Sequence, residues 1–184
     1  MIIERIMNSE LHDLVVKWGS DRNLIKGSSA KDQFLKLVEE FAEVSEAYTQ
    51  NNTTEVKDGI GDVMVVATIM AAQLGENLFD HMAAFALAVE RRPSYCEDLK
   101  LLGDLAGSLA RGNQWFVIKS LVMAVASLFD VAEEHDTSML ECYQAAYDTI
   151  KDRKGVMYDG VFIKESDELY ASIMAELNRA NETI

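Results

Sequence analysis

Proline is almost absent from this chain of 184 residues: Pro93 is the only one, and there are ten glycines. Both residue types disfavour the interior of helices, whereas the frequent alanine, leucine, glutamate and methionine favour it. The sequence therefore predicts helices along almost its whole length. With 49% hydrophobic residues, a chain of this size can bury one full core or two small, tightly packed ones.

Cysteine is scarce as well. Cys96 and Cys142 lie far apart and lack the spacings of metal ligands, so we expect two reduced, buried thiols in a cytosolic protein. The first five residues lack the long apolar run of a signal peptide. The most apolar predicted helical stretch, Val63 to Leu74, is too short to span a bilayer. We expect a cytoplasmic protein that does not enter the membrane.

Basic residues are also few. Lysine and arginine number 17 against 31 aspartates and glutamates, which gives a formal charge of −14. This charge opposes nonspecific binding to nucleic acid polymers and to anionic membranes. No glycine-rich phosphate loop of the P-loop kind is present. An anionic substrate would therefore need metal ions to bridge it to the protein.

Acidic side chains cluster on two consecutive predicted helices, at about 29–48 and 54–74, joined by a short polar turn. They are Glu39, Glu40 and Glu43 on the first helix, and Asp58 and Asp62 on the second. Carboxylates three or four residues apart on a helix point the same way, so each helix offers a group of hard oxygen ligands. If the two groups face each other, they can hold Mg²⁺ or Mn²⁺.

The two acidic groups have different surroundings. The glutamates lie roughly opposite the apolar side of their helix, so they also fit a solvated face. Asp58 and Asp62 instead share their side with Val65 and Ile69, on a helix that is apolar around nearly its whole circumference. A carboxylate buried there costs several kcal/mol unless a cation or donor compensates. The aspartates therefore favour a functional site over a surface charge pair.

Gly59 and Gly61 interrupt the aspartate helix, where each is about 1 kcal/mol worse than alanine. We expect another element to pack closely against them. Capping signals and periodicity predict the other elements: helices at about 9–18, 77–93, 94–112, 113–134 and 138–153, a hairpin at 156–163 turning at Asp159-Gly160, and a last helix at 167–178. The predicted fold is an all-α helical bundle with a small C-terminal β-hairpin and a final helix.

Three helices before Pro93 and three after it indicate an internal duplication. Leu35-Lys36-Leu37 recurs as Leu99-Lys100-Leu101, and a turn two residues shorter then pairs Lys57 with Lys119. This alignment replaces most of the acids: Glu39 becomes Gly103, Glu40 Asp104, Glu43 Gly107, Asp58 Ser120 and Asp62 Ala124. We therefore predict a catalytic half, 1–93, and a structural half, 94–184, within one compact unit.

The acidic pattern resembles the all-α nucleoside triphosphate pyrophosphohydrolases of the MazG and dimeric dUTPase type. That family has Glu-Glu-x-x-Glu on one helix and two acids on the next, which stand here as residues 39–43 and 58–62. The resemblance covers about 15–92 and 151–167, and includes Trp18, Arg22, Gln33, Lys36, the segment 152–155 and the segment 161–165. Gly59 stands where the commoner family form has glutamate, so Asp58 or Glu55 must take that role.

The resemblance implies Mg²⁺-dependent hydrolysis of a nucleoside triphosphate to monophosphate and pyrophosphate. It assigns metal binding to Glu40, Glu43, Asp58 and Asp62, and the attacking water to Glu39. Lys36 is a candidate to reach a phosphate oxygen, or else a solvated lysine. Trp18 is a candidate to stack on the base, or else a core residue.

Assembly is a further expectation. In single-copy members of the family two chains build the four-helix core, and here the second half would replace the partner, leaving one active site per chain. The strand edges of the hairpin and the apolar stripe of the last helix predict further association, as a homo-oligomer such as a dimer.

Two other classes of protein remain open. A di-iron carboxylate bundle needs a Glu-x-x-His pair, and none of His12, His81 and His135 has a glutamate three residues before it. The other alternative is a noncatalytic nucleotide-binding or protein-interaction bundle. Release of pyrophosphate, rather than of single phosphate, from a triphosphate would separate the enzyme from both.

Overall fold

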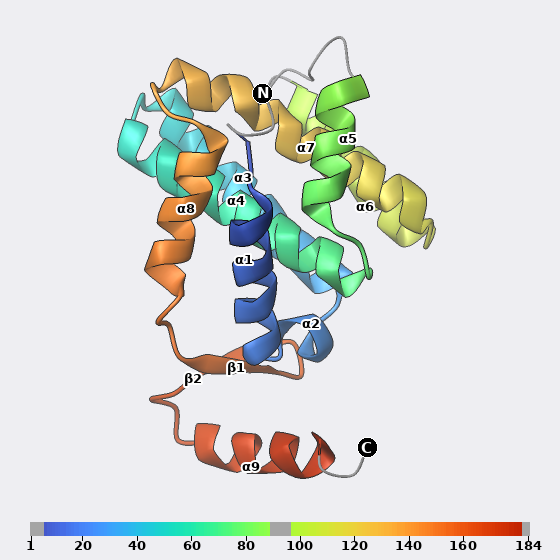
Figure 1. The fold of residues 1–184 in the computed structure, drawn as a ribbon, viewed down its shortest axis with the longest axis vertical. Helices are drawn as coiled ribbons and strands as arrows, with labels where there is room; N and C mark the ends of the chain where they lie inside the picture. Colours follow the sequence, from blue (N-terminus) through green and yellow to red (C-terminus); the bar gives the residue numbers. More distant parts are fainter. Residues whose placement is uncertain (1–5, 89–96, 182–184) are drawn as a thin grey trace.

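The computed structural model describes residues 6–88 and 97–181 (Figure 1). Its elements are α1 Ser9–Asp21, α2 Leu24–Gly27, α3 Ala30–Thr49, α4 Thr53–Gln73, α5 Leu78–Ala88, α6 Asp98–Ala110, α7 Gln114–Glu134, α8 Met139–Ile150, β1 Gly155–Tyr158, β2 Val161–Lys164 and α9 Tyr170–Asn181. The predicted all-α bundle with a hairpin and a final helix is confirmed. The short helix α2 was not predicted, and α9 begins three residues later than expected. The boundary at Pro93, the Ser94 cap and Cys96 lie outside the described residues.

The helices begin where short polar side chains satisfy their first backbone N–H groups. Ser29 and Asp32 form a reciprocal capping box at α3, and Ser138 and Glu141 form another at α8. Asparagine side chains cap four further helices, at Asn8, Asn52, Asn77 and Asn113. These caps confirm the start points predicted for α3, α4, α5, α7 and α8.

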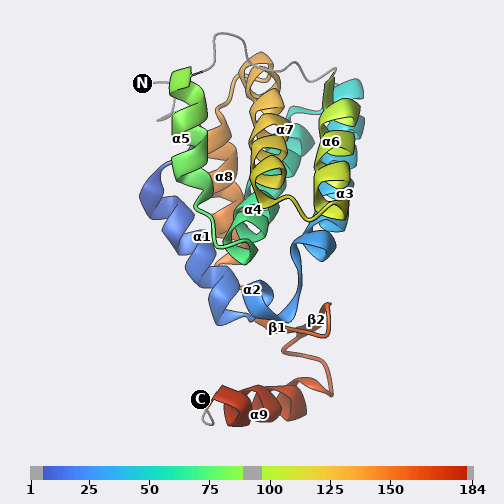
Figure 2. The same cartoon turned by 90° about the vertical axis from the view of Figure 1, so that its right-hand side faces the viewer.

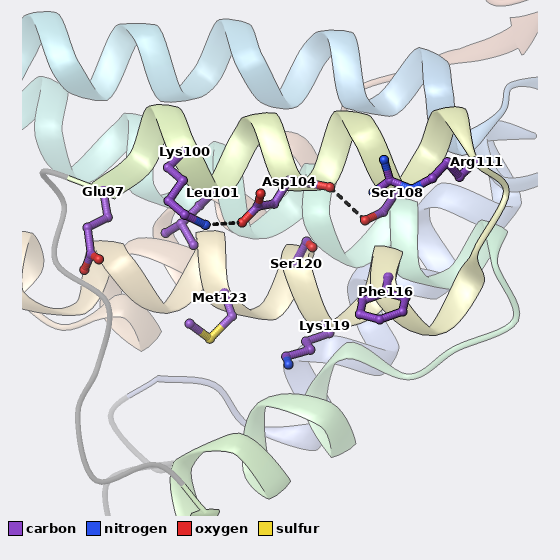
Figure 3. A pocket seen from close by; sticks show the side chains of 10 residues that line it. All are labelled: Glu97, Lys100, Leu101, Asp104, Ser108, Arg111, Phe116, Lys119, Ser120 and Met123. Atoms are coloured by element: carbon purple, nitrogen blue, oxygen red, sulfur yellow. Dashed lines mark hydrogen bonds and ion pairs between the residues drawn. The ribbon is translucent and has the colours of Figure 1, made fainter.

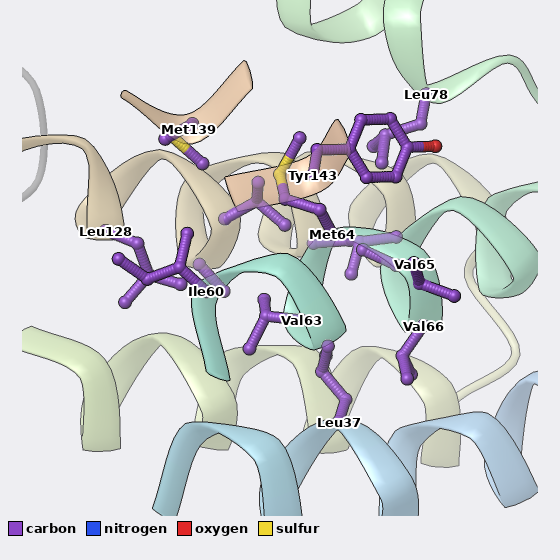
Figure 4. Close-up of a cluster of buried hydrophobic side chains, with 14 of the residues drawn as sticks. Leu37, Ile60, Val63, Met64, Val65, Val66, Leu78, Leu128, Met139 and Tyr143 are labelled. Carbon is purple, nitrogen blue, oxygen red and sulfur yellow. The ribbon is translucent and has the colours of Figure 1, made fainter. Parts of the chain in front are cut away.

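Helix α4 forms the centre of the bundle and packs against α1, α3, α7 and α8. Figure 4 shows Ile60 and Met64 of α4 among Leu37 of α3, Leu128 of α7 and Tyr143 of α8. All five side chains are fully buried, and each such burial contributes about 1.5–3 kcal/mol. The helix is therefore held on nearly every side, as its apolar circumference predicted.

The two glycines of α4 mark its closest contacts. A Cβ atom on Gly59 would meet Val44 of α3, and one on Gly61 would meet the backbone carbonyl of Cys142 and the side chain of Ala146 on α8. The expectation of close packing at these glycines is confirmed. Glycine at 61 lets the backbones of α4 and α8 approach each other.

The hairpins α3–α4 and α6–α7 lie side by side and share their local geometry (Figure 2). The second helix of each begins at an asparagine cap with nearly the same dihedral angles, φ −93° and ψ 90° at Asn52 and φ −93° and ψ 91° at Asn113. Residues with a positive φ angle also occur at corresponding positions of the two hairpins: Asn51 corresponds to Gly112, and Gly75 corresponds to Asp136. Each pair is 61 residues apart (113 − 52, 112 − 51, 136 − 75).

This spacing corrects the alignment drawn from the sequence, which used offsets of 64 residues in the first helix and 62 in the second. The buried positions of α3 and α6 fit both 61 and 64, since Leu101, Leu105 and Ser108 correspond to Glu40, Val44 and Ala47 at 61 and to Leu37, Phe41 and Val44 at 64; the caps and turns decide for 61. The acids then correspond as follows: Glu39 to Lys100, Glu40 to Leu101, Glu43 to Asp104, Asp58 to Lys119 and Asp62 to Met123. Apolar residues recur at every helical turn, so they can be aligned in several registers. Helix caps and left-handed turns occur once per hairpin and allow only one alignment. The division into a catalytic and a structural half stays a prediction.

The β-hairpin turns at Asp159 and Gly160, both with positive φ, and pairs Tyr158 with Val161, as predicted. Its β1 edge is covered, because Met157 N–H donates to the Arg22 carbonyl at 2.8 Å and Met157 O accepts from Asn23 Nδ2 at 2.9 Å. The hairpin therefore docks on the α1–α2 segment. Helix α9 packs on β1, at the far side from the bundle (Figures 1 and 2).

By length and composition, α7 is the only single helix in the described part of the chain that could cross a membrane, and 67% of that apolar stretch is buried inside the bundle. Helices α4 and α5 taken as a pair are also long and apolar enough to cross a membrane, but the chain bends by 111° between them. The expectation from sequence concerned residues 63–74, whereas the longer apolar helix of the structure is α7. The cytoplasmic location stays a prediction.

Candidate functional site

A pocket of about 420 Å³ lies between α3, α4, the end of α8 and the hairpin. Along α4 its lining changes from charged to apolar, since Asp62 stands one turn before Val65 and two turns before Ile69. Five charged side chains line it, namely Asp32, Lys36, Glu40, Asp62 and Arg153. Its apolar lining includes Trp18, Met157 and Phe162. The structure thus brings together four of the seven predicted site residues: Trp18, Lys36, Glu40 and Asp62.

Glu40 is the acid most completely removed from water, with 2% of its surface exposed. Its Oε1 accepts from the Lys36 ammonium at 2.7 Å, while its Oε2 is buried and has no hydrogen-bond partner. Burial raises the pKa of Glu40 although Lys36 lowers it. A buried carboxylate oxygen without a donor costs about 1–3 kcal/mol, so this atom is suited to a bound cation.

Asp62 is half-buried on α4. Burial, followed by the charge of Asp58, raises the pKa of Asp62 to about 6, while Lys36 and Arg153 act in the opposite direction. Asp58 itself is exposed, so the expectation that it stands in an apolar wall is wrong. It lies one turn nearer the start of α4, and the pocket lined by Asp62 does not extend to it.

Glu39 and Glu43 are exposed on α3. Lys36 reaches Glu39 Oε2 at 3.0 Å, and Glu43 is close enough to act on the pKa of both Glu40 and Asp62. Of the three glutamates, only Glu40 points into the protein. The alternative interpretation, that the three form a solvent-exposed face, is therefore correct for Glu39 and Glu43 and wrong for Glu40. Lys36 is an ion-paired lysine, and these hydrogen bonds raise its pKa although burial lowers it.

No three His, Cys, Asp or Glu side chains converge on a common point in the described part of the chain as a bound metal requires. The donor set nevertheless fits a divalent cation on two observations. Glu40 and Asp62 line one pocket with hard oxygen ligands, and Glu40 Oε2 has no other partner. Glu43 and Asp58 lie outside the lining of this pocket but are close enough to raise the pKa of Asp62.

Trp18 is fixed on both its edge and its face. Its Nε1–H donates to the Ile150 carbonyl at 2.8 Å, and the Arg22 guanidinium carbon lies 4.8 Å from the ring centroid. Arg22 also donates to the carbonyls of Arg153 at 2.6 Å and Lys151 at 3.0 Å. Trp18 therefore both lines the pocket and, together with Arg22, holds the segment between α8 and β1 that carries Arg153.

Arg153, Phe162 and Gln33 line the pocket, but the sequence analysis gave them no role. The family resemblance covered all three, and an arginine directly before a hairpin was the available signal. Only the docking of the hairpin on α1 and α2 brings position 153 close enough to Asp62 to lower its pKa.

Comparisons with known proteins give one partial likeness. The chain is 42% identical over 59 residues to an uncharacterized 18.2 kDa protein from the rep-hol intergenic region of Haemophilus phage HP1. The match covers 32% of this chain and 36% of the phage protein, so it spans about a third of the length of that relative. No family model and no solved structure matches the chain.

Proposed function

We propose that this protein is a Mg²⁺-dependent nucleoside triphosphate pyrophosphohydrolase that cleaves ribo- or deoxyribonucleoside triphosphates between the α and β phosphates. The observation that carries the proposal is the pocket of about 420 Å³ with Glu40 and Asp62 in one part and Trp18 and Phe162 in another. A triphosphate carries a charged tail and a flat, largely apolar base, so it needs both kinds of lining. The volume lies within the range of small-molecule sites.

Each residue has a defined task in this proposal. Mg²⁺, when bound, would offset the triphosphate charge and lower the pKa of a coordinated water. Glu40 and Asp62 would hold it from α3 and α4, with Glu43 and Asp58 beside them. Glu39, outside this set, would accept the proton of the attacking water. The assignment of Glu39 rests on the family resemblance.

The two cations of the pocket have separate roles. Arg153 enters from the segment after α8, and its planar guanidinium suits a phosphate oxygen pair. Lys36 now neutralises Glu40 and Glu39 at 2.7 and 3.0 Å. Lys36 would be available to the phosphates if a bound divalent cation neutralised these acids instead.

A second candidate function is noncatalytic binding of nucleotides, and the ion pair of Lys36 favours it. The ammonium already supplies a positive charge to Glu40, so the acids can be satisfied without metal. Such a protein would bind a triphosphate through Arg153 and Trp18 and leave it intact.

The test is incubation with each nucleoside triphosphate and Mg²⁺, with separate detection of pyrophosphate and phosphate. We expect pyrophosphate and nucleoside monophosphate in equal amounts, and a rate at least about a hundredfold lower in Asp62→Asn, the scale expected for loss of one charge-stabilising group. Asp80→Asn, an exposed aspartate on α5, is the control. Release of single phosphate, or full activity in Asp62→Asn, would contradict the enzyme; binding without turnover would support the second candidate.

A further inference from the structure

A second pocket, of about 510 Å³, lies between α6 and α7. Figure 3 shows its side chains on these two helices and on Glu97, the residue before α6. Its lining includes Lys100, Leu101, Asp104, Lys119 and Met123. At the spacing of 61 residues these are the counterparts of the five predicted acids Glu39, Glu40, Glu43, Asp58 and Asp62. The pocket is therefore the counterpart of the acidic site on the second helical hairpin.

The second pocket has different charges from the first at the corresponding positions. Glu39 and Asp58 have lysines as counterparts, Lys100 and Lys119, and Asp62 has the apolar Met123. Asp104 retains a carboxylate, but Lys100 pairs with it at 2.5 Å. Arg111 adds another cation to the lining. The five corresponding positions thus carry only acids on the first hairpin, whereas on the second they carry two lysines and one acid, with Glu97 and Arg111 as further charged lining residues.

Two of these cations, Arg111 and Lys119, have no carboxylate partner among the described residues, and each lies beside a residue four positions earlier in the chain. The guanidinium of Arg111 lies over Gly107, about 3.1 Å from where a Cβ atom would stand. The Lys119 ammonium lies 5.3 Å from the centroid of the Trp115 ring. Arg111 and Lys119 are thus exposed cations that remain able to accept an anion.

The rest of the lining is mixed: Glu97, Ser108 and Ser120 are polar, and Leu101, Phe116 and Met123 are apolar. Leu101 is buried, Met123 is half-buried, and Phe116 lies on α7 one turn before Lys119. Phe116 is 48% exposed and the neighbouring Trp115 is 64% exposed. Large aromatic side chains left open beside unpaired cations are typical of a site for a ligand with a flat apolar body and an anionic group.

We infer that the pocket between α6 and α7 binds a phosphorylated small molecule of nucleotide size without a metal ion. Arg111 and Lys119 contact its phosphate oxygens, and Phe116 and Met123 contact its apolar body. Because Arg111 and Lys119 are exposed, this binding weakens as salt screens the two cations. The inference does not depend on hydrolysis at the first pocket.

The test is calorimetric titration of a nucleoside monophosphate, and separately of inorganic pyrophosphate, into the full chain in EDTA at low salt. We expect one metal-independent site, occupied more tightly by the nucleotide than by pyrophosphate. Replacing both cations, Arg111→Ser with Lys119→Ser, should weaken binding at least about tenfold because both charge-assisted contacts are lost. The Lys26→Ser, Lys31→Ser double variant removes the same charge from exposed positions outside this pocket and should bind normally.

Met123→Asp is a second, independent test. It places a carboxylate where the first hairpin has Asp62, at a half-buried position that tolerates a polar group, and should abolish binding in EDTA. Circular dichroism and thermal unfolding would show that the variants fold. No binding in EDTA, unchanged binding in the Arg111 and Lys119 double variant, or equal weakening in the Lys26 and Lys31 control would overturn the inference. Asp62→Asn should leave this binding unchanged, so failure of the proposed hydrolase and failure of this site are distinguishable.

Discussion

Asp98 stands at the start of α6 and is largely removed from solvent. Its Oδ1 accepts from the hydroxyl of Ser127, a residue with no exposed surface on α7, at 2.7 Å. Burial raises the pKa of Asp98 to about 7, although the hydrogen bond from Ser127 opposes it. The residue therefore binds a proton more tightly in the folded chain than in the unfolded one, where aspartate has a pKa of about 3.9.

This difference predicts a pH-dependent loss of stability. The contribution of Asp98 is fully present below about pH 4 and is lost as the pH rises through about 7, because the unfolded chain releases the proton first. Asp98→Asn keeps an acceptor for Ser127 and cannot ionise. Allowing for partial exposure, we expect the variant to gain about 1–2 kcal/mol over the wild type between pH 4.5 and pH 7.5.

Urea unfolding at the two pH values measures this gain. Asp80→Asn, at an exposed position of α5, is the control and should show a difference from the wild type that does not change with pH. A constant difference for Asp98→Asn as well would show that Asp98 is not proton-linked to folding.

At the scale of single elements, two helical glycines with different surroundings provide a matched comparison. Gly61 of α4 faces the backbone carbonyl of Cys142 on α8, whereas a Cβ atom on Gly103 of α6 would have nothing within 4 Å. Both sit inside helices, where alanine is better by about 1 kcal/mol. Their surroundings alone should decide the sign of each substitution.

Gly61→Ala should destabilise the protein by about 1–3 kcal/mol, because α4 and α8 must separate to admit the methyl group. Gly103→Ala should stabilise it by up to about 1 kcal/mol through helix propensity. Thermal unfolding of both variants tests the pair. Destabilisation by Gly103→Ala, or a neutral Gly61→Ala, would contradict the packing described for these helices.

At the scale of the whole molecule, the formal charge of −14 and the acids of the first pocket make bound cations a source of stability. If Mg²⁺ binds only the folded chain, it raises the free energy of unfolding by about 1.4 kcal/mol at ten times its dissociation constant. We expect the midpoint of thermal unfolding to rise at millimolar Mg²⁺ in the wild type.

Asp62→Asn should lose that rise, and without metal it should be as stable as the wild type or slightly more stable, since a half-buried charge is removed. Replacing Lys119 and Met123, the counterparts of Asp58 and Asp62, should leave the rise intact. An equal rise in wild type and Asp62→Asn would mean that the metal binds elsewhere.

The number of nucleotide-binding sites per chain is a further property of the whole molecule. A nonhydrolysable triphosphate analogue should show one metal-dependent site per chain by calorimetry, in the first pocket. Binding that persists in EDTA and is lost in the Arg111 and Lys119 double variant belongs to the pocket between α6 and α7. Two metal-dependent sites per chain would show that the second hairpin has its own metal centre.

The sequence by itself determined the helical class, the helix starts and the hairpin, because these depend on local interactions. Ser29 with Asp32 and Ser138 with Glu141 cap their helices within four residues, and Asp159-Gly160 specifies a turn through its own backbone preference. Periodicity also predicted correctly that the apolar stretch of α4 from Val63 to Ala71 is buried. The glycines Gly59 and Gly61 indicated close packing before any partner was known.

Tertiary structure alone decided which acids are buried and which residues share a pocket. Glu39, Glu40 and Glu43 read alike in sequence, yet only Glu40 is covered, because burial depends on neighbours far along the chain. The docking of the hairpin brought Arg153 towards Asp62 across about ninety residues of chain. The register between the two helical hairpins followed from caps and left-handed turns at fixed spacing, since apolar periodicity repeats every helical turn and fits more than one alignment.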